Sequence, residues 1–248
     1  MTTQIRDPRA RRDAPAARAQ FPAQRILQIL CADAWFSELP ERLQRAIVAE
    51  SVCRRVAANA LVYAAGDPPT GMFAVLSGGV RLVHHSESGK VAFYRLLVAG
   101  DWFGTISEID GGSRFSDAVA DDDETVVLQL GHAAFHRLYR DDPEAHRAFI
   151  ALICLNLRTT LAMMVENHSA PPREHLARLL VSIFTRPAGP PGTTSRLTQE
   201  ALAAMTGLSR QTVSKVLHQF SREGLIALRY GRIDPLDLDS LASIARER

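Results

Sequence analysis

Residues 198–222 read TQEALAAMTGLSRQTVSKVLHQFSR, and they carry the most specific structural pattern of the chain. Capping and turn preferences predict a short helix over Gln199–Thr206, a tight turn at Gly207 and a second helix over Arg210–Ser221, with Ser209 as its N-cap. Two short helices joined by a tight turn, with the second presenting its N-terminal residues, form a helix-turn-helix.

The second helix is expected to have one buried and one polar face. Val213, Val216, Leu217 and Phe220 recur at the spacing of a buried helical stripe. On the other face, arginine or lysine can pair with guanine and glutamine with adenine. The residues predicted to read or position bases are Arg210, Gln211, Thr212, Ser214, Lys215 and His218.

A wing is predicted directly after these helices. Two β-prone stretches flank a turn at Tyr230-Gly231, with Arg229 and Arg232 beside it. These arginines, together with Thr198 and Ser209, are expected to contact phosphate. Residues 170–248 carry 11 basic and seven acidic side chains, whereas residues 26–169 carry 12 and 18. The helix pair, the wing and the local positive charge together favour DNA binding by the C-terminal part over a helical hairpin that only packs.

The N-terminal half contains three kinds of sequence pattern in succession. Residues 1–25 carry six arginines and no apolar period, which predicts a flexible tail, either without a role or as an arm that attracts DNA. Residues 26–57 have a helical pattern. Short β-prone runs separated by Gly, Pro, Asp and Ser then predict a compact β-barrel or roll. These runs are Leu61–Tyr63, Met72–Leu76, Val80–Val83, Val91–Val98 and Thr125–Leu130.

A long helix is predicted from about Asp141 to Asn167, with Pro143 in its first turn. Its apolar residues cover two sides, one with Phe149, Leu152 and Leu155 and the other with Ile150, Leu157, Leu161 and Met164. A helix that is apolar on two sides must bury both, so one side is expected on the roll and the other against a second copy of the chain. The residues assigned to this dimer helix are Phe149, Leu152, Ile153, Leu157, Leu161 and Met164.

These segments predict an α+β chain with an N-terminal β-roll, a long dimerisation helix and a C-terminal winged helix-turn-helix. The predicted boundaries are 1–25 for the tail, 26–140 for the β-roll sensor domain, 141–169 for the dimerisation helix and 170–248 for the DNA-binding domain. Ala170-Pro171-Pro172 marks the last boundary, because proline cannot continue a helix.

The chain resembles the Crp/Fnr family of dimeric bacterial regulators over residues 26–248. The resemblance rests on Gly66-Asp67-Pro68, Phe73–Arg81, Gly100–Gly104, the long helix and Gly207–Val213. It implies a cyclic-nucleotide-binding-type β-roll in which a signal shifts the dimer helices and re-aims the DNA domains. Related activators bind RNA polymerase through the loop that corresponds to 186–196, so the polymerase is a possible partner, but the sequence of this loop does not show activation.

The resemblance also implies where an effector would bind. In the family members that bind cyclic AMP, a glutamate holds the ribose hydroxyl and an arginine holds the phosphate. Here Thr105 stands at the glutamate position, Arg114 at the arginine position, and Phe115 follows and is expected to obstruct a phosphate. Cyclic AMP is therefore not expected as the effector. The expected pocket residues are Gly104, Thr105, Ile106, Arg114, Phe115, Ser116, Thr160 and Leu161.

Other cofactors receive little support from the sequence. An iron–sulfur cluster needs four thiolates, and the chain has three dispersed cysteines. Haem needs only one or two axial ligands and stays open. His132 and His136 can share a helix face where the roll ends, with the surface as the expected position. His84-His85 would point to opposite faces of a strand, so they cannot chelate one ion together. No metal ligand or catalytic residue is assigned.

The sequence thus predicts a homodimeric regulator that binds an inverted repeat in double-stranded DNA and is modulated by an unidentified effector. Three widely spaced cysteines and the lack of a secretory or membrane-spanning segment predict a cytoplasmic protein without membrane contact. Two alternatives stay open: a regulator that needs no effector and keeps a vestigial pocket, or a small-molecule-binding module whose helix-turn-helix contacts protein. An enzyme is the weakest alternative.

Overall fold

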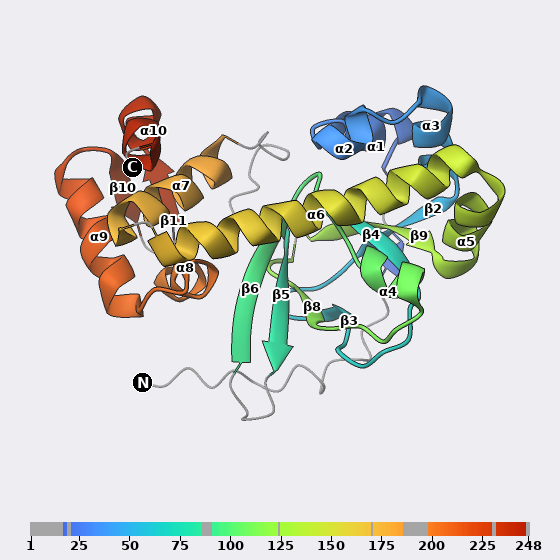
Figure 1. The fold of residues 1–248 in the computed structure, drawn as a ribbon, viewed down its shortest axis with the longest axis horizontal. Coiled ribbons are helices and arrows are strands. Elements are labelled where there is room, and N and C mark those ends of the chain that lie inside the picture. The colour runs from blue at the N-terminus through green and yellow to red at the C-terminus, as the bar shows by residue number, and fades with distance from the viewer. Residues whose placement is uncertain are drawn as a thin grey trace. The chain divides into compact units, whose positions relative to one another are not determined.

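The computed structural model describes residues 17–18, 21–85, 91–123, 125–169, 171–185, 198–229 and 232–246. The chain forms two compact units, and the division falls between Ile153 and Cys154. Figure 1 shows the elements of both units along the chain. The division lies inside the long helix, and the predicted boundaries of the dimerisation helix at 141–169 stay a prediction.

The first unit is a β-roll made of two antiparallel sheets (Figure 1). One sheet has the order β1 (Ala17–Arg18), β2 (Ser51–Arg55), β9 (Val126–Gly131), β4 (Gly71–Ser77) and β7 (Trp102–Phe103). The other has the order β3 (Leu61–Tyr63), β8 (Asp117–Ala120), β5 (Gly79–His85) and β6 (Val91–Val98). The roll that the resemblance implied is therefore confirmed.

Strand β4 is buried along its whole length, and its residues from Met72 to Leu76 are all apolar. Met72 and Leu76 belong to a core on the helical side, whereas Phe73 and Val75 belong to a core between the two sheets. Successive side chains of a strand point to opposite faces, so a strand with two covered faces needs no polar positions. Strand β4 pairs with β7, and the expected pocket residues begin directly after β7, at Gly104.

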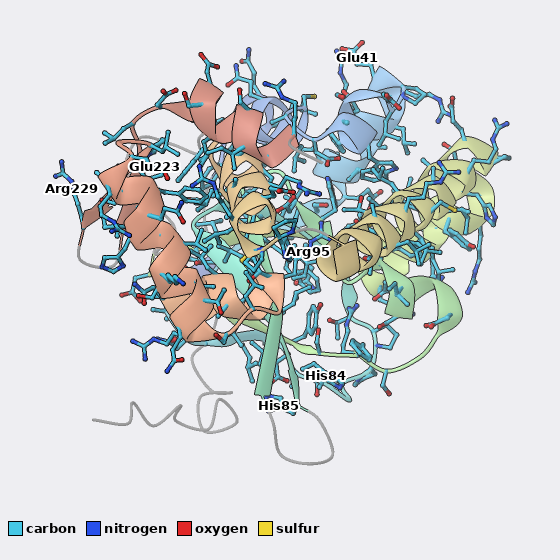
Figure 2. The ribbon with its side chains drawn as sticks, turned by 60° about the vertical axis from the view of Figure 1, so that its left-hand side comes forward. Glu41, His84, His85, Arg95, Glu223 and Arg229 are labelled. Atoms are coloured by element: carbon cyan, nitrogen blue, oxygen red, sulfur yellow. The ribbon has the colours of Figure 1, made fainter. Side chains whose placement is uncertain are left out.

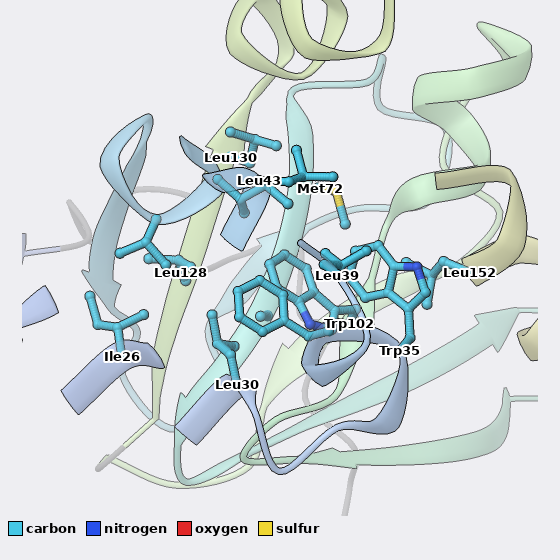
Figure 3. Packing of buried hydrophobic residues seen from close by; sticks show 14 of the residues in the cluster. Ile26, Leu30, Trp35, Leu39, Leu43, Met72, Trp102, Leu128, Leu130 and Leu152 are labelled. Atoms are coloured by element: carbon cyan, nitrogen blue, oxygen red, sulfur yellow. The ribbon is translucent and has the colours of Figure 1, made fainter. Parts of the chain in front are cut away.

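Helices cover the outer face of the first sheet. They are α1 (Ala23–Leu30), α2 (Ala34–Ser37), α3 (Glu41–Ala49), α5 (His132–Asp141) and the N-terminal half of α6 (Pro143–Ser169). Figure 3 shows Trp35 and Trp102 packed together in this core, with ring centroids 5.4 Å apart. Trp35 Nε1 also donates a hydrogen bond to the Ala148 carbonyl of α6 at 2.7 Å. The start of α6 is therefore fixed to the roll by both apolar and polar contacts.

Phe149 is the residue of α6 on which this attachment depends most. Its side chain is fully buried, and its ring lies 4.6 Å from that of Phe135 in α5. We expect Phe149→Ala to lower the free energy of unfolding by about 3–5 kcal/mol, because it leaves a cavity in a rigid core. Urea denaturation at one protein concentration measures the change. Arg147→Ala, an exposed position on the same helix, is the control, and an equal loss in both variants contradicts this role of Phe149.

Several N-terminal predictions need correction. The helical pattern does not continue to Ala57, because Ser51–Arg55 forms β2 and pairs with β9. The predicted tail at 1–25 also overlaps regular structure, since Ala17–Arg18 pairs with β2 and α1 begins at Ala23. Sheet pairing supplies backbone hydrogen bonds that no local helical period reveals. Helices α4 (Thr105–Asp110) and α5 and strands β7 and β8 were not predicted as elements.

The second unit contains α7 (Pro172–Phe184), α8 (Gln199–Thr206), α9 (Arg210–Arg222), β10 (Ile226–Arg229), β11 (Arg232–Pro235) and α10 (Leu238–Arg246). The part of α6 from Cys154 onward also belongs to this unit. The core side chains come from α7, α8, α9 and α10, with Leu180, Leu202, Leu217, Phe220 and Leu241 all fully buried. The predicted helix-turn-helix is confirmed, and α9 begins at the predicted Arg210. Within the described residues, no helix is long and apolar enough to cross a membrane.

Candidate nucleic-acid interface and sensor pocket

The turn between α8 and α9 is built as its residue types require. Gly207 has a φ of 68°, a left-handed conformation that glycine adopts without strain. Ser209 then caps α9, because its Oγ accepts a hydrogen bond from the Thr212 backbone N–H at 3.1 Å. Thr212 is half-buried, and its hydroxyl lies 2.8 Å from Ser209 Oγ. Thr212 therefore supports the cap rather than forming part of the outer face.

The two faces of α9 differ as predicted. Val213, Val216, Leu217 and Phe220 are buried in the second unit. Arg210, Gln211, Lys215 and His218 are exposed, and Ser214 is half-buried. The His218 ring nitrogen Nδ1 lies 2.8 Å from the Ser214 carbonyl. The helix thus presents a row of cationic and hydrogen-bonding side chains that begins at its N-terminus, where the helix dipole also favours an anion.

The sequence reasoning missed the contact that holds the C-terminal end of α9. Arg173 of α7 makes two hydrogen bonds to the Glu223 carboxylate, at 2.8 and 3.0 Å. Its guanidinium also lies over the Phe220 ring, 5.5 Å from the centroid. The hydrogen bond from Arg173 holds the pKa of Glu223 below its ordinary value. No local pattern reveals this pair, because its partners are separated by 50 positions.

The Arg173–Glu223 pair predicts a pH dependence. Because folding lowers the pKa of Glu223, the ion pair stabilises the folded state at pH values above the unfolded-state pKa of about 4.3. This stabilisation is lost as the pH falls through the folded-state pKa. We expect Arg173→Ala to raise the pKa of Glu223 toward its ordinary value, as followed by NMR titration. Arg246→Ala on α10 is the control, and an unchanged Glu223 pKa in the Arg173 variant contradicts the assignment.

The wing forms where it was predicted. Strands β10 and β11 pair with Arg229 opposite Arg232. The Arg229 side chain is 74% exposed and its Nε lies 3.2 Å from Asp234 Oδ2, and in Figure 2 it extends outward from the wing. The predicted turn residues Tyr230 and Gly231, and the loop at 186–196, lie outside the described residues.

Arg114, for which the sequence left open an anion ligand or a surface arginine, is directed into the roll. The residue is 3% exposed. It donates hydrogen bonds of 2.5 Å to the carbonyls of Gly104 and Gly71, and its Nη2 lies 3.3 Å from Glu108 Oε1. Its guanidinium also lies over the Tyr63 ring, 4.6 Å from the centroid. Burial lowers the pKa of Arg114, and a neighbouring carboxylate already balances its charge.

Glu108 on α4 is the second buried charge of this region, and the sequence reasoning assigned it no role. It is 1% exposed, and its Oε1 accepts a 2.5 Å hydrogen bond from the Gly71 N–H. Its Oε2 faces His132 and His136 of α5. Desolvation, followed by the charge of His132, lowers the pKa of His136. The sequence offered one signal for Glu108. It follows Thr105 by three positions, so in a short helix the two side chains lie on the same face.

Thr105 and Ser116 are buried as expected of pocket residues, each at 3% exposure. The Thr105 hydroxyl has no hydrogen-bond partner among the described residues. Gly104 adopts a φ of 79°, and a Cβ there would lie 2.9 Å from Arg114 Nη1. The backbone at Gly104 therefore packs closely against the Arg114 side chain.

Two other expected pocket residues point elsewhere. Phe115 is 68% exposed and stacks on His84, with ring centroids 4.4 Å apart. Ile106 is 63% exposed. Phe115 therefore lies outside the buried segment that holds Arg114, and its obstruction of a phosphate stays a prediction. Figure 2 shows His84 and His85 at the end of β5. His85 contacts Asp117 at 2.9 Å.

The long helix α6 divides its apolar residues differently from the prediction. Phe149 and Leu152 are buried in the core of the roll, but Leu155 is 42% exposed. Ile150, Leu157 and Leu161 are 37%, 55% and 50% exposed. Ile153 is half-buried, and the Met164 side chain lies outside the described residues. Phe149 and Leu152 are thus unavailable to a dimer contact.

Thr160 and Leu161, the last two expected pocket residues, belong to the second unit. Thr160 is exposed, and its hydroxyl donates a 2.9 Å hydrogen bond to the Asn156 carbonyl one turn earlier. Their predicted contact with an effector stays a prediction.

Comparisons with known proteins match both units. Residues 53–142 match the cyclic nucleotide-binding domain, and residues 174–244 match the Crp-like helix-turn-helix domain. A cyclic AMP receptor protein of Thermus thermophilus is 30% identical over 184 residues, which cover 74% of this chain and 83% of that protein. The transcriptional regulator LdrP of the same organism is 28% identical over 196 residues, covering 76% and 94%.

A solved structure agrees with these relatives. A transcriptional regulator of the CRP/FNR family from Thermus thermophilus superposes with a TM-score of 0.62 at 26% identity, covering 80% of this chain and 99% of that one. A cyclic-nucleotide-binding-type roll joined to a winged helix-turn-helix defines a DNA-binding transcription regulator with an effector domain. The chain belongs to the Crp/Fnr family. The matched relatives are transcription regulators, which confirms the prediction of a regulator rather than an enzyme.

Proposed function

We propose that this regulator acts as a homodimer whose two α9 helices read the half-sites of an inverted repeat. The exposed polar face of α9, opposite its buried stripe, is the observation that carries the proposal. Arg210, Gln211, Ser214, Lys215 and His218 read or position bases. Thr198, Ser209, Arg229 and Arg232 hold phosphate, and Thr212 supports the cap of α9.

The exposed apolar side of α6 supports the dimer. At 100° per residue, Ile150, Leu157 and Leu161 fall on one face of the helix. Each is at least 37% exposed, and an apolar strip of this kind is stabilised by burial against an identical strip. A two-fold dimer places two recognition helices on DNA about one helical turn apart.

The inward position of Arg114 supports an effector other than cyclic AMP. Its guanidinium is engaged by Glu108 and two carbonyls. Thr105 supplies no carboxylate for a ribose hydroxyl, and the loss of one charge-assisted hydrogen bond costs about 1.5–3 kcal/mol, or roughly ten- to a hundredfold in affinity. Both terminal nitrogens of Arg114 are thus occupied, and only its buried Nε has no hydrogen-bond partner among the described residues.

Equilibrium dialysis with labelled cyclic AMP tests the effector part of this proposal. We expect no saturable binding at micromolar concentrations of the nucleotide. Saturable micromolar binding that Thr105→Glu strengthens would contradict it, because that result requires an open phosphate site at Arg114.

The engaged Arg114 also favours a second candidate, a regulator that needs no small molecule. The operator affinity of the purified protein, measured with and without a small-molecule extract of cells, separates the two. A change in affinity on adding the extract supports an effector. Equal affinity in both conditions supports the effector-independent regulator.

A further inference from the structure

Three side chains from two helices converge at the edge of the roll. Glu108 lies on α4, and His132 and His136 lie one turn apart on α5. The Nδ1 atom of His132 lies 2.7 Å from Glu108 Oε2, and the Nε2 atom of His136 lies 3.6 Å from the same oxygen. All three atoms lie within 4.8 Å of one another. Within the described part of the chain, no other group of three such side chains converges in this way.

The two oxygens of Glu108 face different partners. Oε1 accepts the Gly71 N–H at 2.5 Å and lies 3.3 Å from Arg114 Nη2, so it is held in place by the roll. Oε2 is directed at the histidine pair. Hydrogen bonds to the far side of a carboxylate are the usual means by which proteins orient a metal ligand. One carboxylate oxygen and two imidazole nitrogens form the ligand set of many zinc sites that keep a water in the fourth position.

We propose that Glu108, His132 and His136 bind one Zn²⁺ ion per chain, with water as the fourth ligand. Imidazole nitrogens favour this ion over Mg²⁺ and Ca²⁺, which prefer oxygen ligands. Tetrahedral coordination at about 2.05 Å places ligand atoms about 3.3 Å apart. The 3.6 Å separation at His136 fits this spacing. The 2.7 Å separation at His132 must open by about half an ångström, and its side chain is 52% exposed and has room to turn.

The ion would link α4 to α5. Oε1 of Glu108 would keep its contacts with Gly71 and Arg114, since the ion uses the other oxygen. His136 is half-buried and His132 is more exposed, so the ion would be reached from the outer side of α5. The proposal is independent of the DNA-binding function proposed above.

Zinc titration of the untagged protein, after removal of metals with a chelator, tests the proposal. Binding is followed by competition with a chromophoric chelator, and Co²⁺ absorption reports tetrahedral geometry. We expect one Zn²⁺ per chain, and about a tenfold or greater loss of affinity in His132→Gln and His136→Gln. His146→Gln is the matched control, because His146 stacks on Tyr139 of α5 with ring centroids 4.3 Å apart but lies outside the cluster.

Glu108→Gln tests the carboxylate as a zinc ligand. Circular dichroism verifies that this variant folds, because Glu108 is buried. Zinc binding that is absent, or that is equal in the His132, His136 and His146 variants, overturns the proposal. The titrations contain no DNA, so a negative result here leaves the DNA-binding function standing.

Discussion

Arg210→Ala is expected to weaken binding to the operator about ten- to a hundredfold, with a much smaller loss on DNA of mixed sequence. Arg210 is exposed in the first turn of α9, where a recognition helix meets base edges. One good bidentate contact between arginine and guanine contributes about 1–3 kcal/mol of discrimination. Fluorescence anisotropy on both duplexes at one salt concentration measures the two losses.

Arg222→Ala is the matched control for this prediction. It removes the same charge from the other end of α9, where Arg222 is also exposed and its Nε lies 3.4 Å from the His218 carbonyl. The control should reduce binding to both duplexes by a similar small factor, as expected for loss of a phosphate-attracting charge. Equal losses on both duplexes for Arg210→Ala would show that Arg210 does not read a base.

The double variant Leu157→Glu, Leu161→Glu is expected to convert the dimer to a monomer and to lower operator affinity at least about a hundredfold. The two leucines are 55% and 50% exposed and lie one turn apart, so four carboxylates would face one another across a two-fold axis. Loss of the dimer removes one of the two half-site contacts. Sedimentation equilibrium measures the mass, and anisotropy measures the affinity.

Leu155 supplies the control for the dimer prediction. It is 42% exposed but lies about 120° or more around the helix from Leu157 and Leu161. Leu155→Glu therefore introduces the same charge on the same helix outside the proposed contact. A dimer that survives the double variant, or that dissociates equally in the Leu155 variant, contradicts the assigned face.

The second unit was more predictable from the sequence than the first. In α9, the cap at Ser209, the apolar period and the polar face all depend on residues close together in the chain. The helix begins at the predicted residue. By contrast, Ser51–Arg55 was predicted as helix and is strand β2. Its conformation depends on pairing with β9, which is about 75 positions away in the chain.

The sensor pocket could be predicted only in part, for the same physical reason. The sequence assigned Thr105, Arg114 and Ser116 to one pocket, and the structure buries all three. It could not reveal that Glu108 neutralises Arg114, because the pair forms only when α4 folds back against the Gly71 backbone. Phe115, the next residue after Arg114, lies outside this buried segment.

DNA reading by α9 is tested by selection of duplexes from a random pool with the purified protein. We expect recovery of an inverted repeat with half-site centres about 10–10.5 base pairs apart, bound with a steep dependence on salt. Arg210→Ala should lose the preference at one position of each half-site. Recovery of no preferred sequence, with or without a cell extract, would contradict DNA reading by α9 and favour a helix-turn-helix that contacts protein.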